Sequence, residues 1–192
     1  MIKNNKASVS YFRFLFTTFF FNCLLIYSQT TAGITEINNE AVAIEAINLC
    51  KSNEKLHLVI IWPKAIGFHK YIISTINNYG SIFYIKNLFI KNYSLIHILK
   101  TIPEKANHIE THLNYYFYGL KEPYNIIVAL CEFKNLETAV KCKAHIRTEL
   151  KLSPEIAALH IADNQKQSLD LALFFFNERL LNNYNQKAFK PS

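Results

Sequence analysis

The sequence predicts an α/β domain of three layers, in which a mostly parallel sheet of four or five strands carries helices on both faces. Short apolar stretches alternate along the chain with longer stretches of helical periodicity. The apolar stretches lack polar alternation, which is typical of parallel strands buried on both faces. The chain has 192 residues, 51% of them apolar and 18% charged, which is enough for one domain with a sizeable core.

Each element follows from a local signal. Strands are expected where apolar and β-branched residues run without interruption, in 56–62, 81–90, 124–133 and a short run within 153–163. Helices are expected where apolar residues recur at helical spacing, in 33–49, 68–80, 94–103, 135–150 and 165–182. Residues 105–119 fit either another helix or an irregular connection. Pro63 and Gly80 end their elements, and Ser94 and Asn135 are suitable N-caps.

The N-terminal segment, residues 1–32, differs from the rest of the chain. Basic residues precede a mainly apolar run, Phe14 to Tyr27, which is shorter than the roughly 20 residues that span a bilayer. Such a run is typical of the central region of a signal peptide, and small residues allow cleavage after Ala32. An uncleaved anchor and a buried helix of a cytosolic protein are the alternatives. We therefore expect a signal peptide or membrane anchor, and a protein that is secreted or membrane-associated through residues 1–32.

The remaining residues are expected to form a single α/β domain over 33–182, followed by a flexible tail over 183–192. The net charge of +7 is compatible with a small anionic ligand, but the basic residues are spread along the chain. There is no specific nucleic-acid signature, and membrane contact is expected only through the N-terminal segment.

The cysteines that remain after cleavage are Cys50, Cys131 and Cys142, and no CxxC pair occurs among them. Their spacing fits neither a zinc site nor a dense disulfide framework. One disulfide with a free thiol is an alternative after export. Cys131 lies inside an expected strand, so we predict that it is buried and unpaired.

The ends of the expected strands supply the candidate functional residues. In an open parallel sheet, ligands bind beyond the carboxyl ends of the strands. Trp62 ends the first strand and Lys64 follows it, Glu132 lies at the end of the third, and His160 and Asp163 lie at the end of the fourth. Parallel strands would bring all five to one crevice. His160 would then be the acid–base residue and Asp163 its orienting or ligand-binding partner, while Lys64 would bind an anionic group.

Each of these residues also has a structural interpretation. Asp163 or Asn164 could cap the last helix by accepting from its first backbone N–H groups. His160 could bond to the backbone, Trp62 could fill the end of the core, and Lys64 could be a solvated surface lysine. The sequence leaves these alternatives open.

Other motifs are weaker. His108 and His112 lie one helical turn apart, but Glu110 is displaced from the general-base position of the zinc-protease pattern, and no third ligand is evident. We therefore predict no metal site. Gly-rich phosphate loops and a nucleophile elbow are missing from the sequence, so the cofactor is unknown.

Two segments, "VIIWPKA" at Val59–Ala65 and "LHIADNQKQSLDLALFFFN" at Leu159–Asn177, resemble a poorly described group of microbial α/β proteins. Some of that group accompany surface-polysaccharide biosynthesis. Its C-terminal strand ends in a histidine, which corresponds to His160, and an acidic residue follows in the helix, for which Asp170 is the nearest candidate. A basic and glycine-rich segment of that group is missing here. The resemblance implies the fold and a transferase-like setting.

Taken together, these patterns favour an enzyme-like domain, such as a transferase, that binds a phosphorylated or sugar-nucleotide ligand at the strand ends. The alternatives are an exported domain that binds without catalysis and a degenerate relative of an enzyme. Cleavage after Ala32 would favour the binding domain, because nucleotide donors are scarce outside the cytosol.

Overall fold

The computed structural model describes residues 33–152 and 158–186. The chain divides into two units, Met1–Gly33 and Ile34–Ser192, and almost all described residues belong to the second. The expected signal peptide or anchor, and residues 187–192 of the expected tail, lie outside the described residues. Within the described ranges, every helix is too short or too polar to cross a bilayer.

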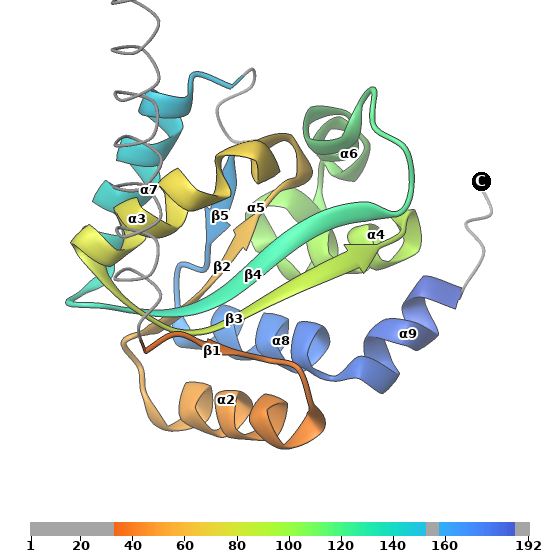
Figure 1. Ribbon diagram of the computed structural model, residues 1–192. Coiled ribbons are helices and arrows are strands. Elements are labelled where there is room, and N and C mark those ends of the chain that lie inside the picture. Colours follow the sequence, from red (N-terminus) through yellow and green to blue (C-terminus); the bar gives the residue numbers. More distant parts are fainter. Residues whose placement is uncertain (1–32, 153–157, 187–192) are drawn as a thin grey trace, which may run out of the picture. The chain divides into compact units, whose positions relative to one another are not determined.

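Five strands of the described chain form one sheet in the order β1-β3-β4-β2-β5 (Figure 1). They are β1 (Thr35–Glu36), β2 (Leu56–Ile61), β3 (Gly80–Ile90), β4 (Tyr124–Phe133) and β5 (Leu159–Ile161). The β1–β3 pair is parallel, whereas the β3–β4, β4–β2 and β2–β5 pairs are antiparallel. The sheet is therefore mixed and mostly antiparallel.

The prediction of a mostly parallel sheet is wrong, although the α/β class is confirmed. β2 and β3 run in the same direction, but β4 lies between them and pairs with both in the opposite direction. An uninterrupted apolar run requires only that both faces of a strand are covered. The apolar runs in the sequence therefore report burial and not strand direction.

Helices cover both faces of the sheet, which confirms the three layers (Figure 1). α3 (His69–Tyr79) and α7 (Leu136–Leu150) lie on one face, and α2 (Glu40–Ser52) and α8 (Gln165–Phe176) lie on the other. The remaining helical segments are η1 (Pro63–Phe68), α4 (Asn92–Thr101), α5 (Pro103–Ala106), α6 (Ile109–Phe117) and α9 (Glu178–Gln186).

Successive side chains of β2 point to opposite faces of the sheet and pack into two separate cores. Leu58 and Ile60 belong to the core under α2 and α8, whereas Val59 and Ile61 belong to the core under α3 and α7. All of β2 is buried. This double burial explains why the β2 segment is apolar without interruption.

Local signals placed several elements and caps correctly. The strand predicted over 124–133 coincides with β4. Asn135 caps α7 by accepting from Thr138 N at 2.9 Å. Asn164 caps α8 by accepting from Gln167 N at 2.8 Å, so the cap is Asn164 and not Asp163.

The first helix begins later than its apolar spacing predicts. Asn39 caps α2 by accepting from Val42 N at 3.0 Å, and the residues before it include β1, at the edge of the sheet. Gly80 does end α3, and it also starts β3. A Cβ at Gly80 would collide with the carbonyl oxygen of Glu132, so the close approach of β3 to β4 requires glycine.

The last helix is divided in two. The side chain of Asn177 accepts from Leu180 N at 2.9 Å and so starts α9, which continues to Gln186, beyond the predicted end of the domain. Ser94 is not an N-cap, because α4 begins at Asn92. Its hydroxyl donates to Asn185 Oδ1 on α9 at 2.6 Å.

Candidate functional site

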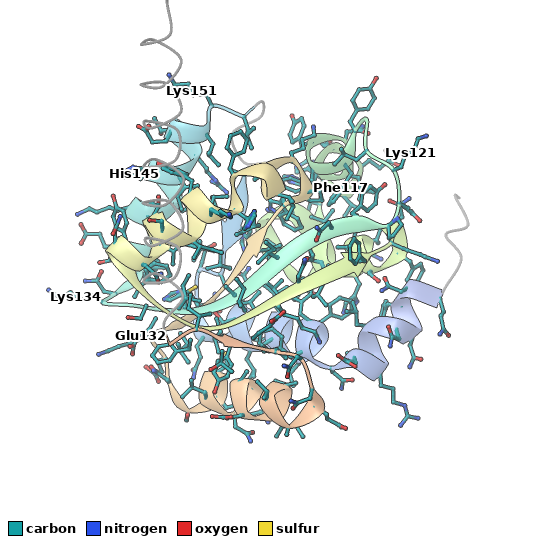
Figure 2. All side chains as sticks on the ribbon, in the orientation of Figure 1. Phe117, Lys121, Glu132, Lys134, His145 and Lys151 are labelled. Atoms are coloured by element: carbon teal, nitrogen blue, oxygen red, sulfur yellow. The ribbon has the colours of Figure 1, made fainter. Side chains whose placement is uncertain are left out.

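The antiparallel arrangement separates the predicted site residues into two groups. Trp62 and Lys64 follow the end of β2, whereas Glu132 on β4 pairs with the first residue of β2. Asp163 follows β5, which also runs opposite to β2. Figure 2 shows Glu132 at the other end of the sheet from Phe117, which packs edge-on against Trp62 at 6.1 Å. The expectation of one shared crevice is therefore wrong.

Glu132 and Asp163 each have a local partner. Asn53 Nδ2 donates to Glu132 Oε1 at 3.1 Å. Lys143 Nζ donates to Asp163 Oδ1 at 2.9 Å and to the carbonyl oxygen of Ile161 at 3.2 Å. These bonds join neighbouring elements, and they support a structural interpretation of both carboxylates.

His160 is almost completely buried and is hydrogen-bonded to α8. Gln167 Oε1 accepts from Asp163 N at 2.9 Å and lies 3.2 Å from His160 Nε2. Because this oxygen can only accept, the proton of the neutral imidazole is assigned to Nε2, and Nδ1 keeps its lone pair.

Burial lowers the pKa of His160 well below its usual range, and the charges of Lys105, Lys143 and Arg147 lower it further. The hydrogen bond to Gln167 acts in the opposite direction. The ring is therefore neutral around pH 7 and is not poised to exchange a proton there. The acid–base role of His160 stays a prediction, and this environment favours a hydrogen-bonding role instead.

A lysine that the sequence analysis did not single out lies beside Trp62. Lys105 on α5 is 4% exposed, and its Nζ donates to Tyr116 Oη at 2.6 Å. The same Nζ lies 5.4 Å from the ring centre of Trp62. The rings of Trp62 and Tyr116 stack with centres 4.6 Å apart and an interplanar angle of 17°. Their electron-rich faces stabilise the buried ammonium.

We define the buried lysine cluster as Trp62, Lys105, Tyr116, His160 and Gln167. His160 pairs with Ile60, which lies two positions before Trp62 on the same strand. The side chains of His160 and Trp62 therefore face the same side of the sheet. The positive charge of Lys105 acts on His160. The cluster therefore includes two of the five predicted residues, and Lys64 lies in η1 at the same end of β2.

The indole N–H group of Trp62 is a buried hydrogen-bond donor in this cluster. The side chain is fully buried, yet its Nε1 has no hydrogen-bond partner among the described residues. A buried N–H without an acceptor costs about 1–3 kcal/mol. The cluster therefore combines a buried positive charge with a buried N–H group that an acceptor would satisfy.

Neither metal ligation nor thiol chemistry is evident in the described part of the chain. No three His, Cys, Asp or Glu side chains there could hold a metal ion together, and His112 instead stacks on Tyr116 at 5.8 Å. Cys50, Cys131 and Cys142 are buried free thiols, which confirms the prediction for Cys131. Burial raises the pKa of Cys50 to about 11 and that of Cys142 to about 12, so these thiols are protonated at neutral pH.

The sequence analysis missed Lys105, Tyr116 and Gln167. Lys105 lies among polar residues and has no local sign of burial. Tyr116 falls in the stretch 105–119, for which two interpretations were open. The spacing of Leu113, Tyr116 and Phe117 is the signal that could have identified the inner face of α6.

Comparisons with known proteins identified no relative of the chain. No family model matches the chain, and no curated protein matches it. The resemblance to a microbial group linked to polysaccharide biosynthesis therefore stays a prediction.

Proposed function

We propose that the domain binds a small ligand through a carboxylate or phosphate group held at the buried lysine cluster. The observation that carries this proposal is the indole N–H of Trp62, which is buried without an acceptor in the described residues and lies beside the ammonium of Lys105. An anionic oxygen near both groups would accept from each of them and would remove the cost of the buried donor.

α5 is the part of the cluster best suited to admit a ligand. It has four residues, and Lys105 N and Ala106 N both donate to the carbonyl oxygen of Ile102, at 2.9 and 3.2 Å. A single turn of helix opens at a lower cost than a strand of the sheet. Movement of α5 would open the Trp62 face to a ligand, and its return would bring Lys105 back beside Trp62 and the bound anion.

This proposal follows the binding alternative of the sequence analysis. His160 is neutral, and the carboxylates Glu132 and Asp163 lie away from Lys64, so the cluster lacks a pair of groups suited to acid–base chemistry. The transferase stays a prediction. Turnover of a bound sugar nucleotide by the purified chain would support it.

Trp62 provides a direct test, because it is the single tryptophan of the chain and its fluorescence reports on the cluster alone. The full chain is titrated separately with inorganic phosphate, a uridine diphosphate sugar and citrate. We expect a saturable change with at least one anion, and the three arms distinguish phosphate from carboxylate ligands. Lys105→Met removes the charge and should abolish the response. Lys86→Met, which alters another buried lysine, is the matched control and should retain it.

Two results would overturn the binding proposal. One is the lack of a saturable change with all three anions, and the other is an equal response of wild type and Lys105→Met. Thermal unfolding shows whether each variant is folded. Tyr116→Phe is a milder second variant, because it removes only the hydroxyl that contacts Lys105. It should weaken binding without abolishing the stacking on Trp62.

A further inference from the structure

A tyrosine and a histidine form a hydrogen-bonded pair where α3 and α7 lie side by side (Figure 1). The hydroxyl oxygen of Tyr79, the last residue of α3, lies 2.8 Å from Nδ1 of His145 on α7. The two rings meet edge to face, with centres 5.7 Å apart and an interplanar angle of 84°. Figure 2 shows His145 away from Phe117, which packs against Trp62 of the buried lysine cluster. The pair is therefore separate from the proposed ligand site.

The packing of the two helices fixes both members of this pair. The ring of Tyr79 is half-buried against the core under α3 and α7, while its hydroxyl reaches His145. Three side chains of α7 point into the same core, namely Ala139, Cys142 and Ile146. His145 belongs to the opposite, exposed side of this helix. The fold therefore holds the phenol beside the imidazole before any substrate arrives.

The geometry of the pair suits the removal of the hydroxyl proton of Tyr79. A phenol is a weak nucleophile, and an adjacent general base activates it by taking its proton. When the hydroxyl donates, Nδ1 of His145 accepts with its lone pair, and Nε2 carries the ring proton. A neutral imidazole in this position acts as the general base of such a pair.

Lys141 adds a positive charge beside the phenol. It precedes His145 by one turn of α7, and its ammonium interacts electrostatically with Tyr79. Its Nζ also lies 2.7 Å from Glu137 Oε1, and both of these side chains are exposed. A cation at this place stabilises the charge of a phenolate and the charge that develops on the oxygen of an attacked carbonyl group. A nucleophile, a base and a cation therefore meet at one surface of the helices.

We propose that Tyr79 is a nucleophile that takes the acyl group of an aryl ester. His145 removes the hydroxyl proton while the Tyr79 oxygen attacks the carbonyl carbon, and Lys141 stabilises the oxyanion that forms. The bond between the acyl carbon and the leaving oxygen then breaks, and His145 gives the proton to that oxygen. The products are the free phenol of the ester and an acyl group on the oxygen of Tyr79.

The basicity of the leaving group sets the class of ester. A phenolate is a weaker base than an alkoxide, so a tetrahedral intermediate that carries both expels the phenolate. Transfer to Tyr79 therefore requires a leaving group about as weakly basic as a phenolate, which aryl esters have and alkyl esters lack. The exposure of His145 leaves the pair accessible to a small ester of this class.

Acetylation of the full chain by p-nitrophenyl acetate tests this inference, because each transfer releases one coloured nitrophenolate. Peptide mass spectrometry locates the acetyl groups, and hydroxylamine removes those on tyrosine oxygens while those on lysine nitrogens remain. We expect Tyr79 to be acetylated at least about tenfold faster than Tyr71, which is exposed on the same helix. Ethyl acetate, an alkyl ester, should leave both tyrosines unmodified.

Three variants separate the nucleophile from the base. Tyr79→Phe keeps the packed ring and should remove the fast phase of nitrophenolate release. Tyr71→Phe is the matched control on α3 and should retain that phase. His145→Gln keeps a hydrogen-bond acceptor beside the hydroxyl but supplies no base, so acetylation of Tyr79 should slow about tenfold or more. Thermal unfolding shows whether each variant is folded.

Two results would overturn the inference. One is an equal rate of acetylation at Tyr79 and Tyr71, which is measured on the wild-type chain and so does not depend on the folding of a variant. The other is a wild-type rate at Tyr79 in His145→Gln, because a hydrogen bond with a purely structural role would leave the rate independent of the imidazole.

Discussion

At one edge of the sheet, the outward carbonyl groups of β5 are covered, whereas at the other edge β3 is covered over only part of its length. Arg147 Nη2 donates to the carbonyl oxygen of Leu159 at 3.0 Å, and Lys143 Nζ donates to that of Ile161 at 3.2 Å. Both cations come from α7. On the β3 side, Asn185 covers one carbonyl and leaves Asn87 open.

The difference shows two ways in which side chains can cover the backbone groups of an edge strand without an additional strand. Long basic side chains reach along an edge and occupy its acceptors, which excludes a partner strand. A short amide can satisfy only one position, so its neighbours stay available. The β5 edge is therefore expected to be structural, whereas the β3 edge keeps backbone groups at Asn87 without a partner in the described residues.

Removal of Lys143 should have the largest effect, because it reopens the closed edge. Lys143→Met deletes the bonds to Asp163 and to the Ile161 carbonyl oxygen, and we expect the free energy of unfolding to fall by about 1–3 kcal/mol. Urea denaturation measures this change. Lys141→Met is the matched control on the same helix, because its pair with Glu137 is exposed, and stability should be almost unchanged. Equal losses in the two variants would contradict a structural role for the β5 edge.

Acid should weaken the β5 edge through His160. Its pKa is lowered in the folded protein, so the unfolded chain binds a proton below about pH 6.5 that the folded chain does not. The free energy of unfolding should therefore fall as the pH drops below about 6.5, by up to about 1.4 kcal/mol per pH unit for this one proton.

His160→Gln keeps a donor toward Gln167 but cannot be protonated, so its stability should depend less on pH. Urea denaturation at pH 7.5, 6 and 5 measures the slope. His145→Gln, at an exposed histidine on α7, is the control for a histidine substitution outside β5. A slope that is unchanged in His160→Gln would show that other groups cause the acid sensitivity.

The smallest expected effect is a change in thiol labelling behind the closed edge. Cys142 lies on α7, and burial raises its pKa to about 12. At pH 8, far less than about one thousandth of this thiol is therefore in the reactive thiolate form. Iodoacetamide should therefore label Cys142 slowly in the native chain, and Lys143→Met should increase this rate while Cys50 is unaffected. Peptide mass spectrometry separates the sites. Rapid labelling of Cys142 in the wild-type chain would show that α7 already opens readily.

The candidate site could be predicted only in part, for a physical reason. Trp62 and His160 were both identified from the ends of apolar runs, and they do lie on one face. Their grouping with Lys105 depends on α5, a single turn of helix for which the sequence has no strong signal. Glu132 and Asp163 were placed at the wrong end because the strands were taken to be parallel.

The sequence by itself determined the α/β class, the positions of the long strands and the cap at Asn135, and it narrowed the cap of α8 to Asp163 or Asn164. These features depend on the burial of whole segments and on hydrogen bonds between residues close in the chain. The tertiary structure decided the order and direction of the strands, and therefore which side chains meet. Strand pairing joins residues far apart in the chain, as in the contacts of β2 with β4 and β5. An apolar run has the same composition whichever way its neighbours run.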